Sequence, residues 1–474
     1  MTLKIDLYTL GLVGVALLFT PQVFVYLVYS LLVLMGRGKS RKLGEYALKS
    51  AHDISFILPV RNEPLDYVER AIKRICELRV PGQEIIVVSD DDPVMKNEIL
   101  EVVSRAQSSG CNVWFIWRSV PRGARTGAVN VGLFASRNPY VYIVDVDTYP
   151  ERCFIDLAVS ILESSSEYAC VVGRWEPLNY ESRLSAALAA GLKYMTTVLY
   201  RARSRLGLYT YPLGTGTLFN SSVLKNTLGG WDERRVQDDM EIGARIMHSG
   251  LRVAYIDDCA IYVENPSSYR AFRVQQYRWA YGALDTAISR AKQILCSKYP
   301  LIVRLDAFFY LLQYTPQVLA FIGGFLLATV TLIKPLDYVL VAFPLLVVYA
   351  GSMLLHSLVL YRETLSATQS TWDAVTQMGR LAAVTSAISL YTLLGTLRAL
   401  FRIKTEYKRT PKGVHQRLYS QLRVPWELLL GLVFLASSAI AVLSKAYITA
   451  IVLLLHAATY LYILARYPRD VFYK

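Results

Sequence analysis

The stretch YVYIVDVDTYPE, residues 140–151, joins a short apolar run to a group of acidic side chains. Aromatic and β-branched residues dominate positions 140–146, which is typical of a buried strand. Asp145 and Asp147 stand two residues apart, so an extended chain points both carboxylates to one side. Two close carboxylates repel each other unless a proton or cation lies between them. The stretch predicts a strand that ends at a site for Mg²⁺ or Mn²⁺. An ordinary solvated turn is the alternative.

Similar apolar runs precede this strand at 54–60 (ISFILPV), 84–90 (EIIVVSD) and 112–117 (NVWFIW). An amphipathic stretch, Leu65–Leu78, lies between the first two runs. Alternating strands and helices predict an α/β domain with a mostly parallel, doubly wound sheet. In such sheets ligands bind beyond the carboxyl ends of the strands, where the acidic pair stands.

The 474 residues are 54% hydrophobic and 19% charged, with a formal net charge of +14. A soluble globular protein carries about 25% charged residues, so the extra apolar content indicates membrane spans. Basic loops on the cytoplasmic side explain the positive charge. The chain shows no pattern of a nucleic-acid-binding module, so nucleic acid is excluded as a partner.

Five spans through the lipid bilayer are predicted, at Leu7–Met35, Leu305–Ile333, Leu336–Leu360, Trp426–Leu443 and Ile448–Ala465. The apolar segment Leu381–Phe401 is predicted to lie in the membrane interface, because a span there would place the basic residues after it outside. The protein is expected in the cell membrane with its soluble domain and C-terminus in the cytoplasm. The expected domains are an N-terminal helix (1–36), a soluble domain (37–300), a hairpin (301–360), interfacial helices with a loop (361–424), and a second hairpin with a tail (425–474).

Six scattered cysteines and five histidines show no metal-binding spacing. The cysteines are expected to be unpaired thiols in a reducing compartment. Gln313, Gln317 and His356, within or beside the predicted spans, are candidates to line a polar path. Hydrogen bonding between helices is the other interpretation of these three residues.

Three further stretches carry chemistry. In VQDDMEIGAR (236–245), Asp238 and Asp239 either cap a helix or supply a general base. In PRGARTGAVNVGL (121–133), the arginines could bind phosphate or could simply be solvated. In RVQQYRWAYGAL (273–284), Gln275, Arg278 and Trp279 share one helical face, where they could bind phosphate and stack on a sugar. A surface arginine beside a core tryptophan is the alternative.

Taken together, the motifs D…DVD…QDD…QQYRW resemble the D, DxD, [T/E]ED, QxxRW signature of processive family 2 glycosyltransferases, such as cellulose, chitin and hyaluronan synthases. The resemblance covers roughly residues 1–465 and includes YKRTPKG (407–413), which is similar to the gating loop of that family. It implies a cytoplasmic domain of GT-A type, a metal-dependent reaction with a UDP-sugar, and a growing polysaccharide or glycolipid as the acceptor.

The resemblance also implies a role for each matching residue. Asp239, beside Asp238, would be the catalytic base, Asp147 with Asp145 would bind the metal, and Trp279 would support the acceptor sugar. The donor would be bound by Arg61, Glu63, Asp90, Arg125, Asp145, Gln275, Arg278, Thr410 and Lys412. An in-line attack would invert the anomeric carbon and give a β-linked polymer that crosses the membrane.

The chain departs from the family pattern at three places. In the third motif Gln237 replaces the usual threonine or glutamate and Asp238 replaces the longer glutamate, and in the loop Tyr407 and Arg409 replace Phe and Val. The stretch SDDDP leaves open whether Asp90 or Asp91 serves the donor. Two other functions were weighed: transfer of a single sugar to a lipid carrier, and a transporter whose nucleotide-binding domain is inactive.

Overall fold

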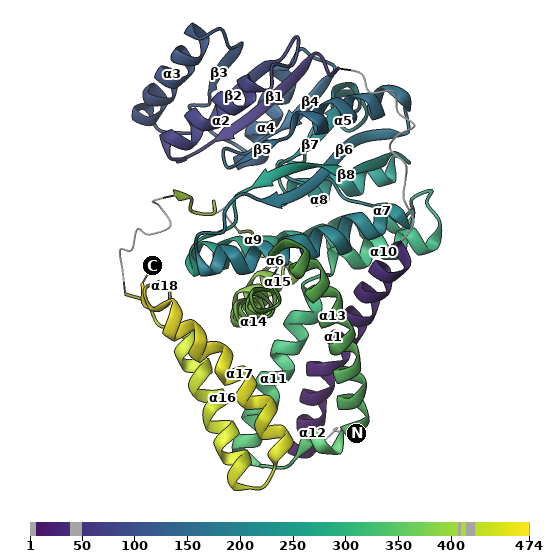
Figure 1. Cartoon of the computed structure of the whole chain (residues 1–474), viewed down its shortest axis with the longest axis vertical. Helices are drawn as coiled ribbons and strands as arrows, with labels where there is room; N and C mark the ends of the chain where they lie inside the picture. Colours follow the sequence, from purple (N-terminus) through teal and green to yellow (C-terminus); the bar gives the residue numbers. More distant parts are fainter. Residues whose placement is uncertain (1–5, 38–49, 369, 406–408, 414–421, 474) are drawn as a thin grey trace.

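The computed structural model describes residues 6–37, 50–368, 370–405, 409–413 and 422–473. It has two parts along its longest axis (Figure 1). A sheet with helices on both faces forms one end, and a bundle of long helices forms the other. Helix α9 (Tyr269–Leu295) runs across the boundary between them. The division agrees with the predicted GT-A-type α/β domain and helical membrane region.

In the described part of the chain the sheet has eight strands, in the order β3-β2-β1-β4-β7-β6-β8-β5. Their bounds are β1 (Ile54–Val60), β2 (Glu84–Ser89), β3 (Val113–Trp117), β4 (Tyr140–Ile143), β5 (Thr148–Pro150), β6 (Tyr168–Pro177), β7 (Thr217–Asn220) and β8 (Arg252–Val263). The pairs β1–β2, β1–β4, β2–β3 and β6–β8 are parallel, and the other three neighbouring pairs are antiparallel. The sheet is therefore mixed, with its parallel half where the sequence predicted it.

Helices cover both faces of this sheet because successive strand residues point to opposite sides. Phe56 and Leu58 of β1 pack toward α2 (Leu65–Glu77), α3 (Pro93–Ser108) and α5 (Arg152–Ser164). Ile57 packs on the other side, in the core that includes residues of α4 (Ala124–Ala135), α8 (Asp238–His248) and α9. Since β1, β2 and β4 are parallel, their carboxyl ends meet at one edge. The predicted site residues follow these ends.

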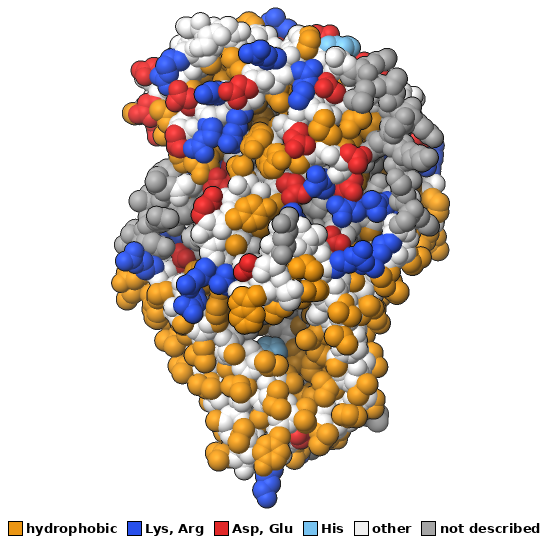
Figure 2. Space-filling model, in the orientation of Figure 1, with side chains coloured by type: hydrophobic (Ala, Val, Ile, Leu, Met, Phe, Trp, Pro, Cys, Tyr) orange, Lys and Arg blue, Asp and Glu red, His pale blue; other side chains and the backbone are white. Residues whose placement is uncertain are grey.

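Among the residues that the structure describes, five helices are long and apolar enough to cross a membrane. They are α1 (Leu7–Gly36), α11 (Thr315–Ile333), α13 (Phe343–Thr368), α16 (Trp426–Leu443) and α17 (Tyr447–Arg466). Hydrophobic side chains cover this end of the molecule, whereas charged side chains gather over the sheet (Figure 2). The number of spans agrees with the prediction. The second span is shorter than predicted, because the chain breaks after α10 (Leu301–Leu311) and α11 starts with Pro316 in its first turn.

The segment predicted to lie in the interface forms parts of two helices. These are α14 (Thr371–Ala387) and α15 (Ser389–Leu400), which bend by 44° at their junction. Figure 1 shows α14 nearly end-on, whereas α11 and α17 run along the longer dimension of the bundle. This crosswise position fits a helix on the membrane surface better than a span, although together the two helices are apolar enough for a sixth span.

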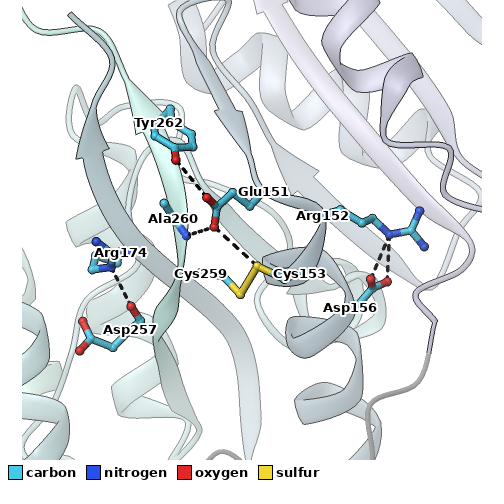
Figure 3. The surroundings of a disulfide bond; sticks show 9 residues. All are labelled: Glu151, Arg152, Cys153, Asp156, Arg174, Asp257, Cys259, Ala260 and Tyr262. Atoms are coloured by element: carbon cyan, nitrogen blue, oxygen red, sulfur yellow. Dashed lines mark hydrogen bonds and ion pairs between the residues drawn. A yellow bond between two sulfur atoms is a disulfide. The ribbon is translucent and has the colours of Figure 1, made fainter.

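The expectation that all cysteines are unpaired is wrong for four of them. Cys76 bonds to Cys111 and Cys153 bonds to Cys259, each with a Cα–Cα distance of 6.0 Å. Sequence separations of 35 and 106 residues gave no motif that could reveal these pairs. In Figure 3, the second bond ties the first turn of α5 to β8, beside Glu151, which accepts hydrogen bonds from Tyr262 Oη (3.0 Å) and the Ala260 amide (2.8 Å). Both disulfides thus lie in the sheet domain.

We expect the variant Cys153→Ser to lower the stability of the sheet domain by ~2–4 kcal/mol, because it releases a long covalent loop in the unfolded chain. Thermal unfolding of the purified full-length protein in detergent, with and without reductant, measures this loss. Mutation of Cys296, an exposed free cysteine, is the matched control and should change little. Peptide mapping without reduction should find both cross-links, and four freely alkylated thiols in their place would contradict the pairing.

Candidate active site

One cavity of about 960 Å³ opens beyond the carboxyl ends of β1, β2 and β4. It extends from there past α8 and α9 to residues of α10, α11 and α14. All thirteen site residues predicted from the sequence line it: Arg61, Glu63, Asp90, Arg125, Asp145, Asp147, Asp238, Asp239, Gln275, Arg278, Trp279, Thr410 and Lys412. Segments far apart in the sequence thus converge on one space.

The acidic pair lies in the turn after β4, which ends at Ile143. The Asp145 amide donates to Thr215 Oγ1 (3.1 Å), and Thr148 Oγ1 donates back to the Asp145 carbonyl (3.0 Å), which fixes the turn. Arg125 Nη2 lies 2.9 Å from Asp145 Oδ1. Burial alone would raise the pKa of Asp145, but the nearby cations, Arg125 foremost, outweigh it and hold the pKa below its ordinary value. Asp145 therefore remains a carboxylate.

Two adjacent carboxylates begin α8, where helix N-terminal amides favour negative charge. Asp239 Oδ1 accepts hydrogen bonds from Gln237 Nε2 (2.6 Å) and the Met240 amide (2.7 Å), and its Oδ2 accepts from the Gly214 amide (3.1 Å). Burial and the neighbouring charge of Asp238 nevertheless raise the pKa of Asp239 to about 6. Such a carboxylate can accept a proton near neutral pH.

Arg125 connects the two acidic groups. Its guanidinium pairs with Asp145 and with Asp238, and it also donates to the Gly214 carbonyl (2.6 Å). Asp238 thus pairs with Arg125, whereas Asp239 accepts hydrogen bonds from the Gln237 side chain and from the amides of Gly214 and Met240. Burial raises the pKa of Asp238 as well, opposed by Arg125. This division of contacts makes Asp239 the better candidate for a base.

Helix α9 contributes the motif that the sequence placed on one helical face. Gln275, Arg278 and Trp279 are partly buried and line the cavity together, as their spacing predicted. Ser268 caps the helix by accepting from the Ala271 amide (3.1 Å). Gly282, one turn further on, packs so closely on Gln237 that an added Cβ would lie 2.4 Å from Gln237 Cβ. This close approach places the motif beside the start of α8.

Residues at or just after the ends of β1 and β2 line another part of the cavity. Asp90 accepts a bidentate pair of hydrogen bonds from Arg118 Nε and Nη2, both 2.5 Å long. Asp91 accepts from Ser89 Oγ (2.8 Å) and does not line the cavity. Of the two aspartates left open by the SDDDP stretch, position favours Asp90, and its role at the donor stays a prediction. Arg118 is a partner that the sequence did not reveal.

The segment 409–413 covers the same side of the cavity. Arg409, Thr410 and Lys412 all line it. Arg409 Nη1 lies 2.6 Å from Glu63 Oε2, and Lys412 Nζ lies 3.0 Å from Asp147 Oδ1. Tyr407, which was compared with the family's loop motif, lies outside the described residues.

Gln313 and Gln317, which were candidates to line a polar path, do line this cavity, whereas Tyr310 and Tyr314 were missed. The four residues are spaced like one face of a helix, a pattern in the sequence that could have revealed the two tyrosines. No pattern in the sequence indicated that Tyr200 would line the cavity. It lies in a π-helix (Thr196–Ala202), and its hydroxyl is 3.2 Å from that of Tyr310. His356 does not line the cavity. It pairs with Tyr194 Oη (2.9 Å) and stacks on Tyr26, so its role is packing between helices.

The residues fit a hard divalent cation. Asp145 and Asp147 offer oxygen ligands in a partly closed site, and the Lys412 ammonium already rests against Asp147, which shows that the position attracts positive charge. Arg278 and Lys412 leave cationic side chains beside the carboxylates, where a diphosphate could bind. The arrangement can therefore hold a metal–diphosphate group next to a buried base.

Comparisons with known proteins agree with this chemistry. Residues 140–355 match the family model described as Glycosyl transferase family group 2. A probable glycosyltransferase of Sulfolobus acidocaldarius is 29% identical over 462 residues, 94% of this chain and 96% of that protein. Glucomannan 4-beta-mannosyltransferase 7 of Arabidopsis thaliana is 29% identical over an aligned stretch that covers 56% of this chain and 49% of the plant protein.

A solved mannosyltransferase of Pyrobaculum calidifontis, in complex with GDP-Man and Mn²⁺, shares the fold at a TM-score of 0.54. The sequences are 18% identical, and the match covers 83% of this chain and all of that one. The carboxylate-lined cavity, the matched family model and the named relatives lead to one conclusion: the chain has a GT-A-like fold whose residues 140–355 are similar to glycosyl transferase family group 2, and it is a glycosyltransferase.

Proposed function

We propose that this chain is a membrane-integrated, inverting polysaccharide synthase. It transfers sugar units from a nucleotide-sugar to a growing β-linked polymer and passes the polymer across the membrane. One observation carries the proposal: a single cavity joins Asp147, Asp239 and Trp279 and continues to Gln317 of α11, one of the candidate spans. The domains predicted from the sequence are part of this proposal, with 37–300 as the catalytic domain in the cytoplasm of a cell-membrane protein.

In this mechanism Asp239 removes the proton from the acceptor hydroxyl, whose oxygen attacks the anomeric carbon of the donor. The nucleoside diphosphate leaves from the opposite face, so an α-linked donor gives a β-linked product. Arg278 and Lys412 stabilise the charge that develops on the leaving diphosphate. Asp145 and Asp147 would hold a divalent cation, which would supply further neutralisation of that charge. Holding both substrates in one cavity makes the displacement effectively unimolecular.

The first experiment identifies the nucleotide of the donor. The family resemblance favours a UDP-sugar, whereas the Pyrobaculum mannosyltransferase was solved with GDP-Man and the plant relative is named a mannosyltransferase, so GDP-mannose is a second candidate donor. Purified protein should be given a panel of UDP- and GDP-sugars with Mn²⁺ or Mg²⁺, and the product should be sized. A long polymer supports the proposal. A single-sugar lipid product supports transfer to a lipid carrier instead, and transfer from no donor overturns both.

Trp279 provides a test of the acceptor site. We expect Trp279→Ala to weaken acceptor use roughly tenfold, because a sugar ring loses the flat indole on which it stacks, while donor hydrolysis changes less. Rates of transfer and of hydrolysis are measured on the same preparation. Equal loss of both activities would contradict the acceptor role. Replacement of Trp372, an exposed tryptophan in α14 that does not line the cavity, is a matched control.

The raised pKa of Asp239 predicts the acid side of the pH profile. The base must be ionised to accept a proton, and its pKa lies near 6 instead of the ordinary 3.8. Transfer should therefore be full above this pH and fall tenfold per unit as the pH drops below about 6. Initial rates at saturating metal, between pH 4 and 8, measure the midpoint. A midpoint near pH 4 would contradict the role of Asp239 as the base, because burial and the charge of Asp238 raise its pKa.

A further inference from the structure

The segment 409–413 places two cations against the acidic side of the cavity. Lys412 Nζ lies 3.0 Å from Asp147 Oδ1 and 3.4 Å from Glu63 Oε1. Arg409 Nη1 lies 2.6 Å from Glu63 Oε2. The side chains of Lys412 and Glu63 are only 12% and 8% exposed, so these are shielded pairs and not a surface contact. Glu63 thus binds both cations of the segment.

These contacts give each carboxylate of the acidic pair a cationic partner without a metal. Arg125 pairs with Asp145, and Lys412 pairs with Asp147. A divalent cation on Asp147 would lie a few ångströms from the Lys412 ammonium, and like charges at that distance repel strongly in a shielded site. The metal alone must therefore displace Lys412. A nucleoside diphosphate changes the balance, because its negative oxygens give the displaced ammonium a new partner.

We propose that Lys412 holds the cation position at Asp147 while the donor site is empty, and that the donor diphosphate draws it away so that metal and donor bind together. Glu63 and Arg409 are positioning residues that keep Lys412 in place. The inference rests on the proposed function, since it assumes a metal-dependent nucleotide-sugar site. It assigns Glu63 to the loop segment, where the family resemblance had assigned it to the nucleotide.

The experiment measures Mn²⁺ binding and not turnover. Full-length protein in detergent is titrated with Mn²⁺ alone and with UDP or GDP, and free Mn²⁺ is followed by its electron paramagnetic resonance signal. Wild type should bind Mn²⁺ weakly alone and at least about tenfold more tightly with the nucleotide, and by linkage Mn²⁺ should strengthen nucleotide binding by the same factor. Lys412→Met should bind Mn²⁺ alone about tenfold more tightly than wild type, with less gain from nucleotide.

Two further variants separate charge from structure. Lys412→Arg keeps the cation and should keep the weak binding of Mn²⁺ alone. Lys404→Met removes an exposed lysine outside the cavity and should behave as wild type. Arg409→Gln loosens the hold on Glu63 and should give a smaller gain in affinity for Mn²⁺ alone, of about threefold.

Two outcomes overturn the inference: Lys412→Met binding Mn²⁺ no more tightly than wild type, or wild type binding Mn²⁺ equally well without nucleotide. If Arg409→Gln equals wild type, the positioning role of Arg409 is wrong. The proposed function fails separately, in the donor panel: wild type that couples Mn²⁺ to nucleotide but transfers no sugar would leave the Lys412 contact standing and remove the synthase activity.

Discussion

Asp239→Asn should lower the rate of sugar transfer roughly 10³-fold, the usual size of a general-base contribution, while the donor still binds. The amide has the size of the carboxylate but cannot accept a proton at neutral pH. Asp239 Oδ1 already accepts two hydrogen bonds, whereas Oδ2 accepts one, from the Gly214 amide. Oδ2 therefore keeps the capacity to take the proton of the acceptor hydroxyl.

Transfer and donor binding must be measured on the same variant. Donor affinity, read by titration with a labelled nucleotide-sugar, should stay within about twofold, because the base acts on the acceptor and not on the diphosphate. Asp258→Asn, an exposed aspartate of β8, is the matched control and should remain active. Unchanged turnover in Asp239→Asn would remove this residue as the base, and the neighbouring Asp238 would become the candidate.

The parallel half of the fold followed from local patterns. The run 54–60 is β1 and the run 84–90 contains β2, because buried parallel strands read as continuous β-branched stretches. The pairing of β6 with β7 and β8 was not predicted, since it joins residues about 45 to 85 positions apart and leaves no periodic signal. The mixed character of the sheet could therefore not be inferred from the sequence.

The site was predictable where residues follow strand ends or share a helical face. Asp145 and Asp147 follow β4, and Trp279 lies on the predicted face of α9. Contacts between residues far apart in the sequence were not predictable. These contacts determine which cation pairs with each carboxylate of the site. Arg118 binds Asp90, and Arg409 binds Glu63 over a separation of 346 residues. The two disulfides belong to the same class of long-range contact.

Asp147→Asn should lower metal-dependent transfer roughly 10³-fold, because an amide is a poor substitute for a carboxylate ligand of a hard divalent cation. Folding should survive, since the carboxylate of Asp147 pairs with Lys412 on the cavity wall and not with the core. Transfer measured over a range of Mn²⁺ concentrations tests this expectation, with thermal unfolding of the same variant as the check on folding.

The metal dependence also distinguishes this loss from that of Asp239→Asn. A weakened metal ligand shifts the Mn²⁺ concentration needed for half-maximal transfer, so excess Mn²⁺ should restore part of the activity of Asp147→Asn. A missing base leaves that concentration unchanged, and no amount of Mn²⁺ should restore Asp239→Asn. If both variants responded to Mn²⁺ in the same way, the division of the cavity into a metal side at Asp147 and a base at Asp239 would be wrong.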